Sequence, residues 1–338
     1  MNADGGEALR RCLPDDLFEL YAETSRRTYD RRESIVLDDQ LSELSSQPHL
    51  GPRTKGRGRI PGVHRRTLRS ILRARLGDSF RPGQAVTGYK ETPDGVSVTL
   101  ADGSTAQGDV LVGADGIRSA VRRQRLPGTT IIDAGVRGLG VFGRTPLTPG
   151  LLEQLPPNLF DGVIIAPDVT LEPVEDYVMI SCSVAPGTRI PPAAEWTAET
   201  PAMLRDAMLS AIEGWHPAAQ ALVAGVDLDS VFVIPFGSLE LAPPWEPSRV
   251  TMIGDAAHAM LPTLGMGANL ALRDAAHLLD QLSAAVRGEV DLVTAIGIHE
   301  QQMRDYVYPF MRMTMEHDRQ FGGGALEDRE QHDDASAS

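Results

Sequence analysis

An acidic turn and a pair of glycines between positions 249 and 274 are the residues best suited to bind a ligand. Asp255 follows Gly254 at the end of the apolar run Val250 to Ile253, a pattern typical of a buried strand that ends in a carboxylate. An ionised carboxylate only accepts hydrogen bonds, so polyol hydroxyl groups are suitable partners for Asp255. The sequence therefore predicts a ligand-binding turn after this strand.

Gly265 and Gly267 directly precede a predicted helix. Five apolar residues are expected on the inward face of this helix: Leu272, Ala275, Ala276, Leu279 and Leu282. Glycines let the backbone approach a ligand closely, and the free N–H groups of a first helical turn carry about half a positive charge. The helix start therefore suits an anionic or electron-rich ring, although Gly-Met-Gly alone is also consistent with an ordinary turn.

A second buried strand, within residues 109–113, runs into Asp115-Gly116, and a helix with Ser119 in its cap region follows. A third pattern, residues 63–76, predicts an amphipathic helix with arginines outward and four apolar residues inward: Leu68, Ile71, Leu72 and Leu76. The Arg65 guanidinium could pair with a phosphate. A tight turn and a basic surface helix are the alternative interpretations of these two segments.

Together these strings resemble the motifs of the class A flavoprotein monooxygenases, the aromatic hydroxylase family that includes salicylate hydroxylase-like enzymes. The resemblance implies that Asp255 binds the ribityl chain of FAD. It also implies that a loop lays its backbone along the flavin ring, through Pro262, Gly265, Gly267, Ala268 and Asn269. Met266 stands where this family usually has glutamine, and we expect the change to be tolerated because the loop contacts the ring through its backbone.

The same resemblance implies roles for the other two segments. Asp115 and Gly116 correspond to residues that contact the pyrophosphate region of FAD and are implicated in the use of a nicotinamide cofactor. Arg65 holds the position of an arginine that contacts the flavin cofactor. His258 is expected to pack beside the flavin loop rather than act as an acid or base.

The implied fold is mixed α/β: an FAD-binding, Rossmann-like domain of the glutathione reductase type, with an inserted β-sheet substrate domain. We expect the FAD-binding domain to be discontinuous, over residues 1–128 and 247–321, and the β-rich substrate domain to span 129–246. Residues 322–338 are glycine-rich, then acidic and serine-rich, and are expected to form a disordered tail.

The family opens with a strand, a Gly-x-Gly-x-x-Gly turn and a helix that bind the adenosine pyrophosphate. No strand precedes Gly5-Gly6, and the glycines at 135–140 are interpreted as lacking both the motif spacing and a following helix. We therefore expect an FAD-binding domain truncated at its N-terminus, without the first βαβ unit, as in a fragment of a longer protein. The alternative is an inactive fragment or natural short form with weak or no FAD binding.

The function implied by the resemblance is that of an FAD-dependent monooxygenase. NADPH or NADH reduces the flavin, and one oxygen atom of dioxygen passes through a flavin peroxide to a small organic, aromatic or polyketide-like substrate. The flavin carries the chemistry, so no catalytic side chain is predicted, although Pro262 is expected near its reactive edge. A halogenase or epoxidase would share the motifs, but the three tryptophans lack the halogenase Trp-x-Trp-x-Ile arrangement: Trp196, Trp215 and Trp245.

Composition narrows the class of protein and its partners. The net charge of −14 over 338 residues argues against nucleic acid and anionic membrane surfaces as partners. Cys12 and Cys182 are too few for a disulfide framework and lack metal-ligand spacing, which favours a reducing compartment. Since neither a signal peptide nor a run of about twenty apolar residues is found, we expect a cytoplasmic protein with no membrane partner.

Overall fold

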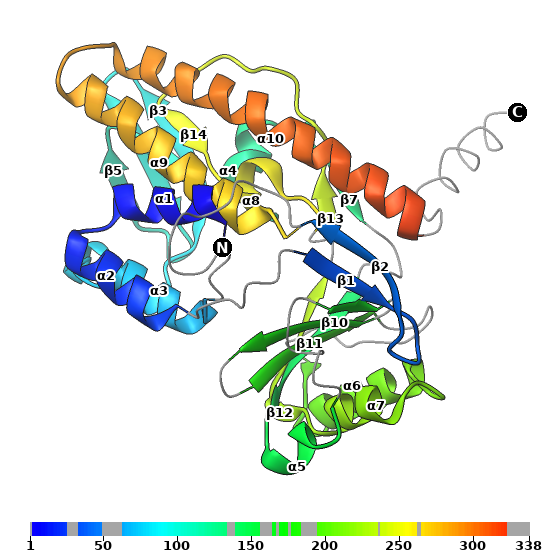
Figure 1. Cartoon of the computed structure of the whole chain (residues 1–338). Coiled ribbons are helices and arrows are strands. Elements are labelled where there is room, and N and C mark those ends of the chain that lie inside the picture. The colour runs from blue at the N-terminus through cyan, green and yellow to red at the C-terminus, as the bar shows by residue number, and fades with distance from the viewer. Residues whose placement is uncertain are drawn as a thin grey trace, which may run out of the picture.

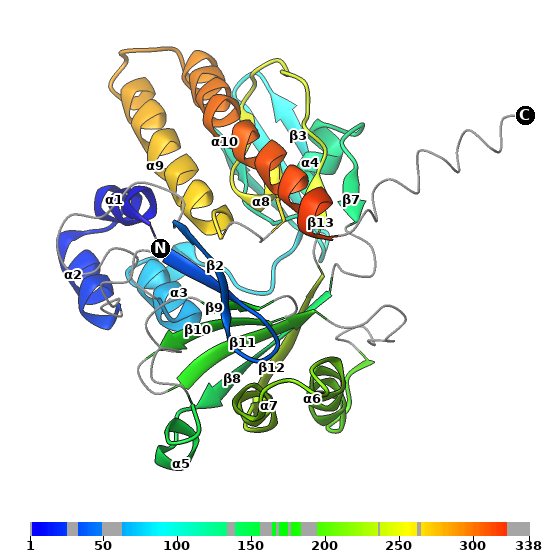
Figure 2. The same ribbon diagram turned by 45° about the vertical axis from the view of Figure 1, so that its right-hand side comes forward.

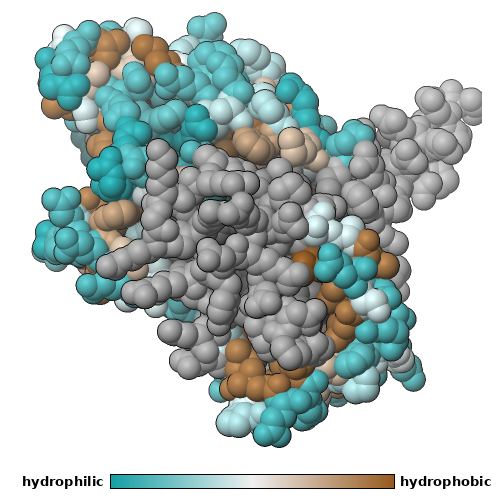
Figure 3. Space-filling model, in the orientation of Figure 1, coloured by the Kyte–Doolittle hydropathy of each residue, from teal (hydrophilic) through white to brown (hydrophobic). Residues whose placement is uncertain are grey.

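A computed structural model describes residues 2–25, 33–48, 63–133, 139–155, 164–166, 169–174, 177–183, 195–235, 237–261 and 265–322. Figure 1 shows an upper body, in which long helices lie beside small sheets, and a lower body around one large sheet. On the face seen in Figure 3, hydrophilic residues predominate over the upper body, and hydrophobic residues show along the lower body.

The large sheet has seven strands in the order β12-β8-β11-β10-β9-β1-β2. Their bounds in that order are Asp227–Pro235, Leu139–Pro146, Tyr177–Ser183, Val169–Val174, Ile164–Ala166, Glu33–Leu37 and Glu43–Pro48. All neighbours pair antiparallel except β1 and β9, which are parallel. The sheet thus takes β1 and β2 from residues 33–48, outside the 129–246 range expected for a substrate domain.

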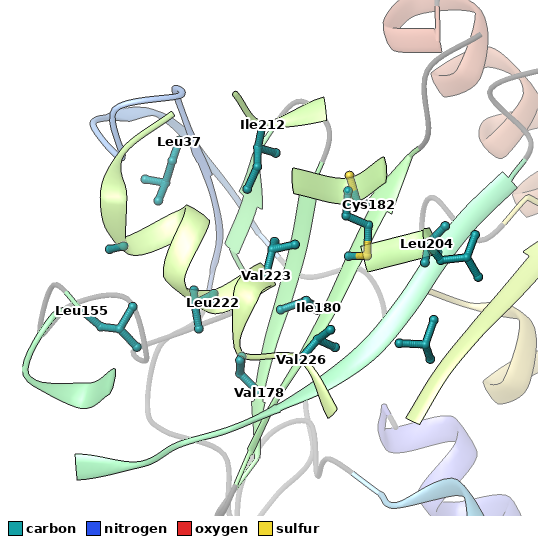
Figure 4. Close-up of a cluster of buried hydrophobic side chains, with 14 of the residues drawn as sticks. Leu37, Leu155, Val178, Ile180, Cys182, Leu204, Ile212, Leu222, Val223 and Val226 are labelled. Atoms are coloured by element: carbon teal, nitrogen blue, oxygen red, sulfur yellow. The ribbon is translucent and has the colours of Figure 1, made fainter. Parts of the chain in front are cut away.

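One face of this sheet is covered by α6 (Thr200–Ala211) and α7 (Pro217–Ala224), as Figure 2 shows, and the short α5 (Pro149–Leu152) lies near its edge. Alternate residues of β11 point toward these helices, because side chains alternate between the two faces of a strand. Val178, Ile180 and Cys182 are almost fully buried there beside Leu204 and Leu222 (Figure 4). Burying each large apolar side chain contributes about 1.5–3 kcal/mol, so this cluster is the main core of the lower body.

A two-stranded parallel sheet lies at the centre of the upper body. Its strands are β6 (Leu111–Gly113) and β14 (Val250–Met252), which confirms the two strands predicted before the acidic turns. All of β14 is buried as expected, whereas Leu111 and Val112 of β6 are only partly buried. Before β6 the alternating pattern of residues 85–112 predicts three strands, the last over residues 105–112. The first two are present as β3 (Val86–Thr92) and β4 (Gly95–Leu100), but the third is divided into β5 (Thr105–Gly108), which pairs antiparallel with β4, and β6. A further antiparallel pair is formed by β7 (Ile131–Asp133) and β13 (Gly237–Leu239). This pair brings together the two ends of residues 134–236.

Helices α9 (Gly267–Val286) and α10 (Leu292–Gly322) lie side by side in both Figure 1 and Figure 2. The short helices α4 (Ala120–Arg125) and α8 (Asp255–His258) follow the two central strands. The predicted inward face of α9 is partly wrong, because Leu279 is 43% exposed whereas Leu278 is buried. The reason is that α9 packs against both α10 and α1 (Ala3–Cys12). Its buried residues therefore lie on more than one face of the helix.

The N-terminal residues form two helices, where the sequence favours one helical stretch over residues 8–30. Helix α1 ends at Cys12 and α2 (Asp15–Thr24) begins after Pro14. Leu13 is extended, as expected for a residue before proline. Helix α2 packs against α3 (Arg65–Arg73), which is followed by a single 3-10 turn at Gly77–Ser79.

The expectation that the glycines at 135–140 lack the motif spacing is wrong, because Gly138, Gly140 and Gly143 have the Gly-x-Gly-x-x-Gly spacing. The last two lie inside strand β8, which ends at Pro146 and leads into the short helix α5 only after Thr148. At Gly143 an added Cβ would overlap the side chain of Val226, so this glycine serves close packing within the sheet body. The spacing therefore does not form a dinucleotide-binding turn.

The expected C-terminal tail and the expected lack of a membrane-spanning segment concern the ends and the helices of the chain. The expected tail lies outside them, except that Gly322 ends α10. No helix in the described part of the chain is long and apolar enough to cross a membrane.

Candidate functional site

The two acidic turns emerge at the same edge of the central parallel sheet. Met252 pairs with Gly113, and the N–H of Ile253 donates to the Gly113 carbonyl at 3.0 Å. Because the strands run in the same direction, the turns that carry Asp115 and Asp255 both follow their carboxyl ends. Ligands of open α/β sheets bind at this edge.

The turn at Gly254 requires a glycine and presents an exposed carboxylate. Gly254 has φ +57°, and its carbonyl accepts the N–H groups of Ala257 and His258 at 2.8 and 2.9 Å. Asp255 begins α8 and is exposed, and no described residue donates a hydrogen bond to its side chain. Its carboxylate is therefore available to accept hydroxyl groups.

The predicted flavin loop opens α9, a helix of 20 residues. Gly265 is exposed with φ +61°, and an added Cβ at either Gly265 or Gly267 would meet no atom within 4 Å. Met266, at the N-cap, provides no side-chain cap, and Ala268 in the first turn is exposed. An uncapped helix start with open space beside it suits an electron-rich or anionic ring. Pro262 lies outside the described residues.

Asn269 holds this loop together from within. Its side chain is buried, donates from Nδ2 to the Gly265 carbonyl at 3.3 Å and accepts the N–H of Asn2 at 2.8 Å. Asn2 in turn caps α1 by accepting the N–H of Gly5 at 3.0 Å. The Asn269 side chain therefore joins the loop to α1, and the loop backbone is the part left to face a ligand.

Asp115 caps a helix. One of its carboxylate oxygens accepts the N–H of Ala120 at 2.7 Å, at the start of α4. Gly116 has φ +77°, and an added Cβ there would meet no atom within 4 Å. Ser119 completes the cap by accepting the N–H of Arg122 at 2.9 Å.

Arg122 connects the two acidic turns. Its guanidinium is buried, donates from Nη1 to the Ala256 carbonyl at 3.0 Å and donates from Nη2 to the Ile117 carbonyl. Burial lowers the pKa of Arg122, an effect that the nearby Asp115 carboxylate opposes. The side chain thus fixes α4 against α8.

Arg65 is the first residue of α3 and is exposed, with no side-chain hydrogen bond or ion pair to another described residue. A free guanidinium at this place is compatible with a phosphate partner.

The residues present fit the flavin-ring half of an FAD molecule. An exposed carboxylate suits the ribityl hydroxyls, and the uncapped start of α9 suits the ring. For the adenosine half, the part of the chain that the structure describes contains no strand, Gly-x-Gly-x-x-Gly turn and helix in succession.

Comparisons with known proteins agree with this geometry. The family model described as FAD binding domain matches residues 64–292. The chain belongs to this family. FAD is therefore its cofactor, and the expected class A monooxygenase resemblance and mixed α/β fold are confirmed.

Several relatives of the chain are named monooxygenases or hydroxylases. A dual O-methyltransferase/FAD-dependent monooxygenase of Phaeosphaeria nodorum is 27% identical, over 96% of this chain but 40% of its own length. The salicylate hydroxylase of Pseudomonas putida is 28% identical, over 86% of this chain and 70% of its own. The structure of a Klebsiella pneumoniae HpxO variant complexed with FAD superposes with a TM-score of 0.74 at 25% identity, covering 97% of this chain and 82% of that one.

Proposed function

We propose that the chain acts as an FAD-dependent monooxygenase on a small aromatic or polyketide-like organic substrate, with dioxygen as co-substrate and NADPH or NADH as reductant. The observation that carries the proposal is that two acidic turns meet at one sheet edge beside the uncapped start of α9. The named activity of the salicylate hydroxylase relative supports an aromatic substrate.

In this proposal Asp255 accepts the ribityl hydroxyls, and the backbone of Gly265, Gly267 and Ala268 lies along the flavin ring. When bound, the flavin supplies the redox chemistry with the nicotinamide cofactor and dioxygen. The first-turn N–H groups of α9 stabilise negative charge on the ring, since they form the positive end of a helix dipole. The Asp115-Gly116 turn lies toward the pyrophosphate region, and Arg65 pairs with a phosphate.

The domain division in this proposal keeps residues 1–128 and 247–321 for the cofactor and 129–246 for the substrate, with β1 and β2 extending the substrate sheet. Val141 faces the α6 and α7 core, so Phe142 faces the opposite side of the sheet. Phe142 stacks on Phe232 there, with ring centroids 5.2 Å apart and planes 12° apart. A stacked aromatic pair on this face supports an aromatic substrate.

A titration of the full chain with FAD, followed by flavin fluorescence, tests the cofactor site. Asp255→Asn should weaken FAD binding about tenfold or more, because a charged acceptor for hydroxyl groups is lost. Asp229→Asn removes an exposed carboxylate from β12 and should leave FAD affinity unchanged.

Oxygen uptake with NADPH or NADH, in the presence of salicylate and related phenols, tests the reaction. Uptake that rises with a phenol and yields a hydroxylated product supports the monooxygenase. A chain that binds no FAD would instead support the inactive fragment or short form, and an affinity unchanged by Asp255→Asn would overturn the role given to Asp255.

A further inference from the structure

A carboxylate with no role in the motifs lies in the middle of α9. Asp274 is 0% exposed. Aspartate is unfavourable in a helix interior, and burying an ionised carboxylate is costly unless hydrogen bonds compensate. Asp274 is therefore expected to have strong partners.

Three donors meet this carboxylate. The N–H of Gly254 donates to Oδ2 at 2.8 Å, and His258 Nε2 lies 2.5 Å from the same oxygen. The Tyr306 hydroxyl donates to the other oxygen, Oδ1. Since an ionised carboxylate only accepts, His258 carries its proton on Nε2. Burial, and then the Asp274 charge, raise the pKa of Tyr306, which keeps that hydroxyl protonated as a donor.

These donors come from three parts of the site: the turn after β14, helix α8 and helix α10. Ala271 lies one turn before Asp274 on the same face of α9. An added Cβ on Gly254 would lie 3.0 Å from the Ala271 Cβ, so the Gly254 turn rests directly on this face. The same helix begins with the Gly265 to Asn269 loop. Asp274 thus fixes the turn that carries Asp255 relative to the loop.

We infer that Asp274, with His258 and Tyr306, is the positioning unit of the flavin-ring half-site, which aligns Asp255 with the start of α9 for FAD. This inference rests on the proposed function. Asp274 acts through Gly254 and does not itself touch the cofactor. Replacing one of its oxygens by a donor leaves a buried partner without an acceptor, so the turn would shift away from α9.

FAD titration of Asp274→Asn in the full chain, with urea unfolding of the same protein, tests this role. FAD should bind at least about tenfold more weakly to the folded variant. Asp305→Asn, an exposed change beside Tyr306 on α10, should leave the affinity unchanged. A purely structural role would lower the urea midpoint but leave the FAD dissociation constant of the folded protein unchanged.

A second pair of variants covers the case in which Asp274→Asn does not fold. His258→Gln keeps an N–H donor near the position of Nε2 and should retain FAD affinity, whereas His258→Leu removes the donor and should weaken binding. Equal FAD affinity in both His258 variants, or in Asp274→Asn and the unchanged chain, would overturn this inference alone. A lack of FAD binding by the unchanged chain would overturn the proposed function, and this inference with it.

Discussion

At the scale of single residues, two residues predicted to bind the cofactor make side-chain hydrogen bonds to the protein. Asp115 caps α4, and Asn269 joins Gly265 to Asn2. The motif spacing indicated the turn that carries Asp115 and the loop that carries Asn269, and their role at the site stays a prediction. The spacing could not predict the hydrogen-bond partner of Asn269, because Asn2 is 267 positions away and only folding brings the two residues together.

Gly254→Ala should destabilise the protein by about 1–3 kcal/mol, because φ +57° strains an L-residue and the new Cβ would meet Ala271 at 3.0 Å. Urea unfolding measures the loss. Gly288→Ala is the matched control, since Gly288 has φ +73° but no atom within 4 Å of an added Cβ, and should cost only about 1 kcal/mol. Equal losses in the two variants would show that contact with Ala271 does not matter.

At the scale of elements, local patterns predicted β3, β4, β14 and helix α3, and the structure confirms them, whereas the strand predicted over residues 105–112 is divided into β5 and β6. The predicted inward face of α3 is partly wrong: Ile71 is buried, but Leu72 is 39% and Leu76 is 44% exposed. Periodicity shows that a helix has an apolar side, but the extent of burial depends on neighbours from elsewhere in the chain. For α3 the principal neighbour is the short helix α2.

Helix α1 is a second element whose extent depends on contacts with distant parts of the chain. It contains Gly5 and Gly6, which disfavour a helix locally. Asn2 caps it locally, but the hydrogen bond from Asn2 to Asn269 and the packing against α9 both involve residues more than two hundred positions away. The sequence alone therefore could not predict where this helix begins.

The contact between α10 and β14 should make stability depend on pH. Thr251 Oγ1 donates to Glu300 Oε1 at 2.9 Å, both side chains are fully buried, and burial raises the pKa of Glu300 above its ordinary value of 4.5. Above that value the unfolded chain releases a proton that the folded protein still holds. The contribution of Glu300 to stability is therefore present at low pH and is lost as pH rises through the raised pKa.

Glu300→Gln should remove this dependence while keeping an acceptor for Thr251. Urea unfolding from about pH 4.5 to about pH 8 should show the variant gaining stability over the unchanged chain as pH rises. Asp305→Asn, an exposed change on the same helix, is the control. A stability difference that stays constant with pH would contradict the role assigned to Glu300.

At the scale of the whole molecule, the apolar cores are separate. The core beneath the seven-stranded sheet shares no buried residue with the clusters around the central parallel sheet and the flavin loop, among the residues that the structure describes. A sequence can indicate that a segment such as 129–246 is richer in predicted strands than the segments on either side of it. It could not show that β1 and β2 cross over into the same sheet, because that parallel pairing joins strands far apart in the chain.

The separation of cores predicts different effects for two equally buried side chains. Ile180, in strand β11 of the large sheet, is 0% exposed in the core of the lower body. Met303 is 1% exposed in the cluster that contains Met266 of the flavin loop. Ile180→Ala and Met303→Ala should each destabilise the protein by about 2–5 kcal/mol in urea unfolding. Measured well below either unfolding transition, FAD affinity should fall about fivefold or more only in Met303→Ala, because only that cavity adjoins the loop. An equal fall in both variants would mean that the two bodies couple through the site, and no fall in either would mean that the loop does not depend on its core.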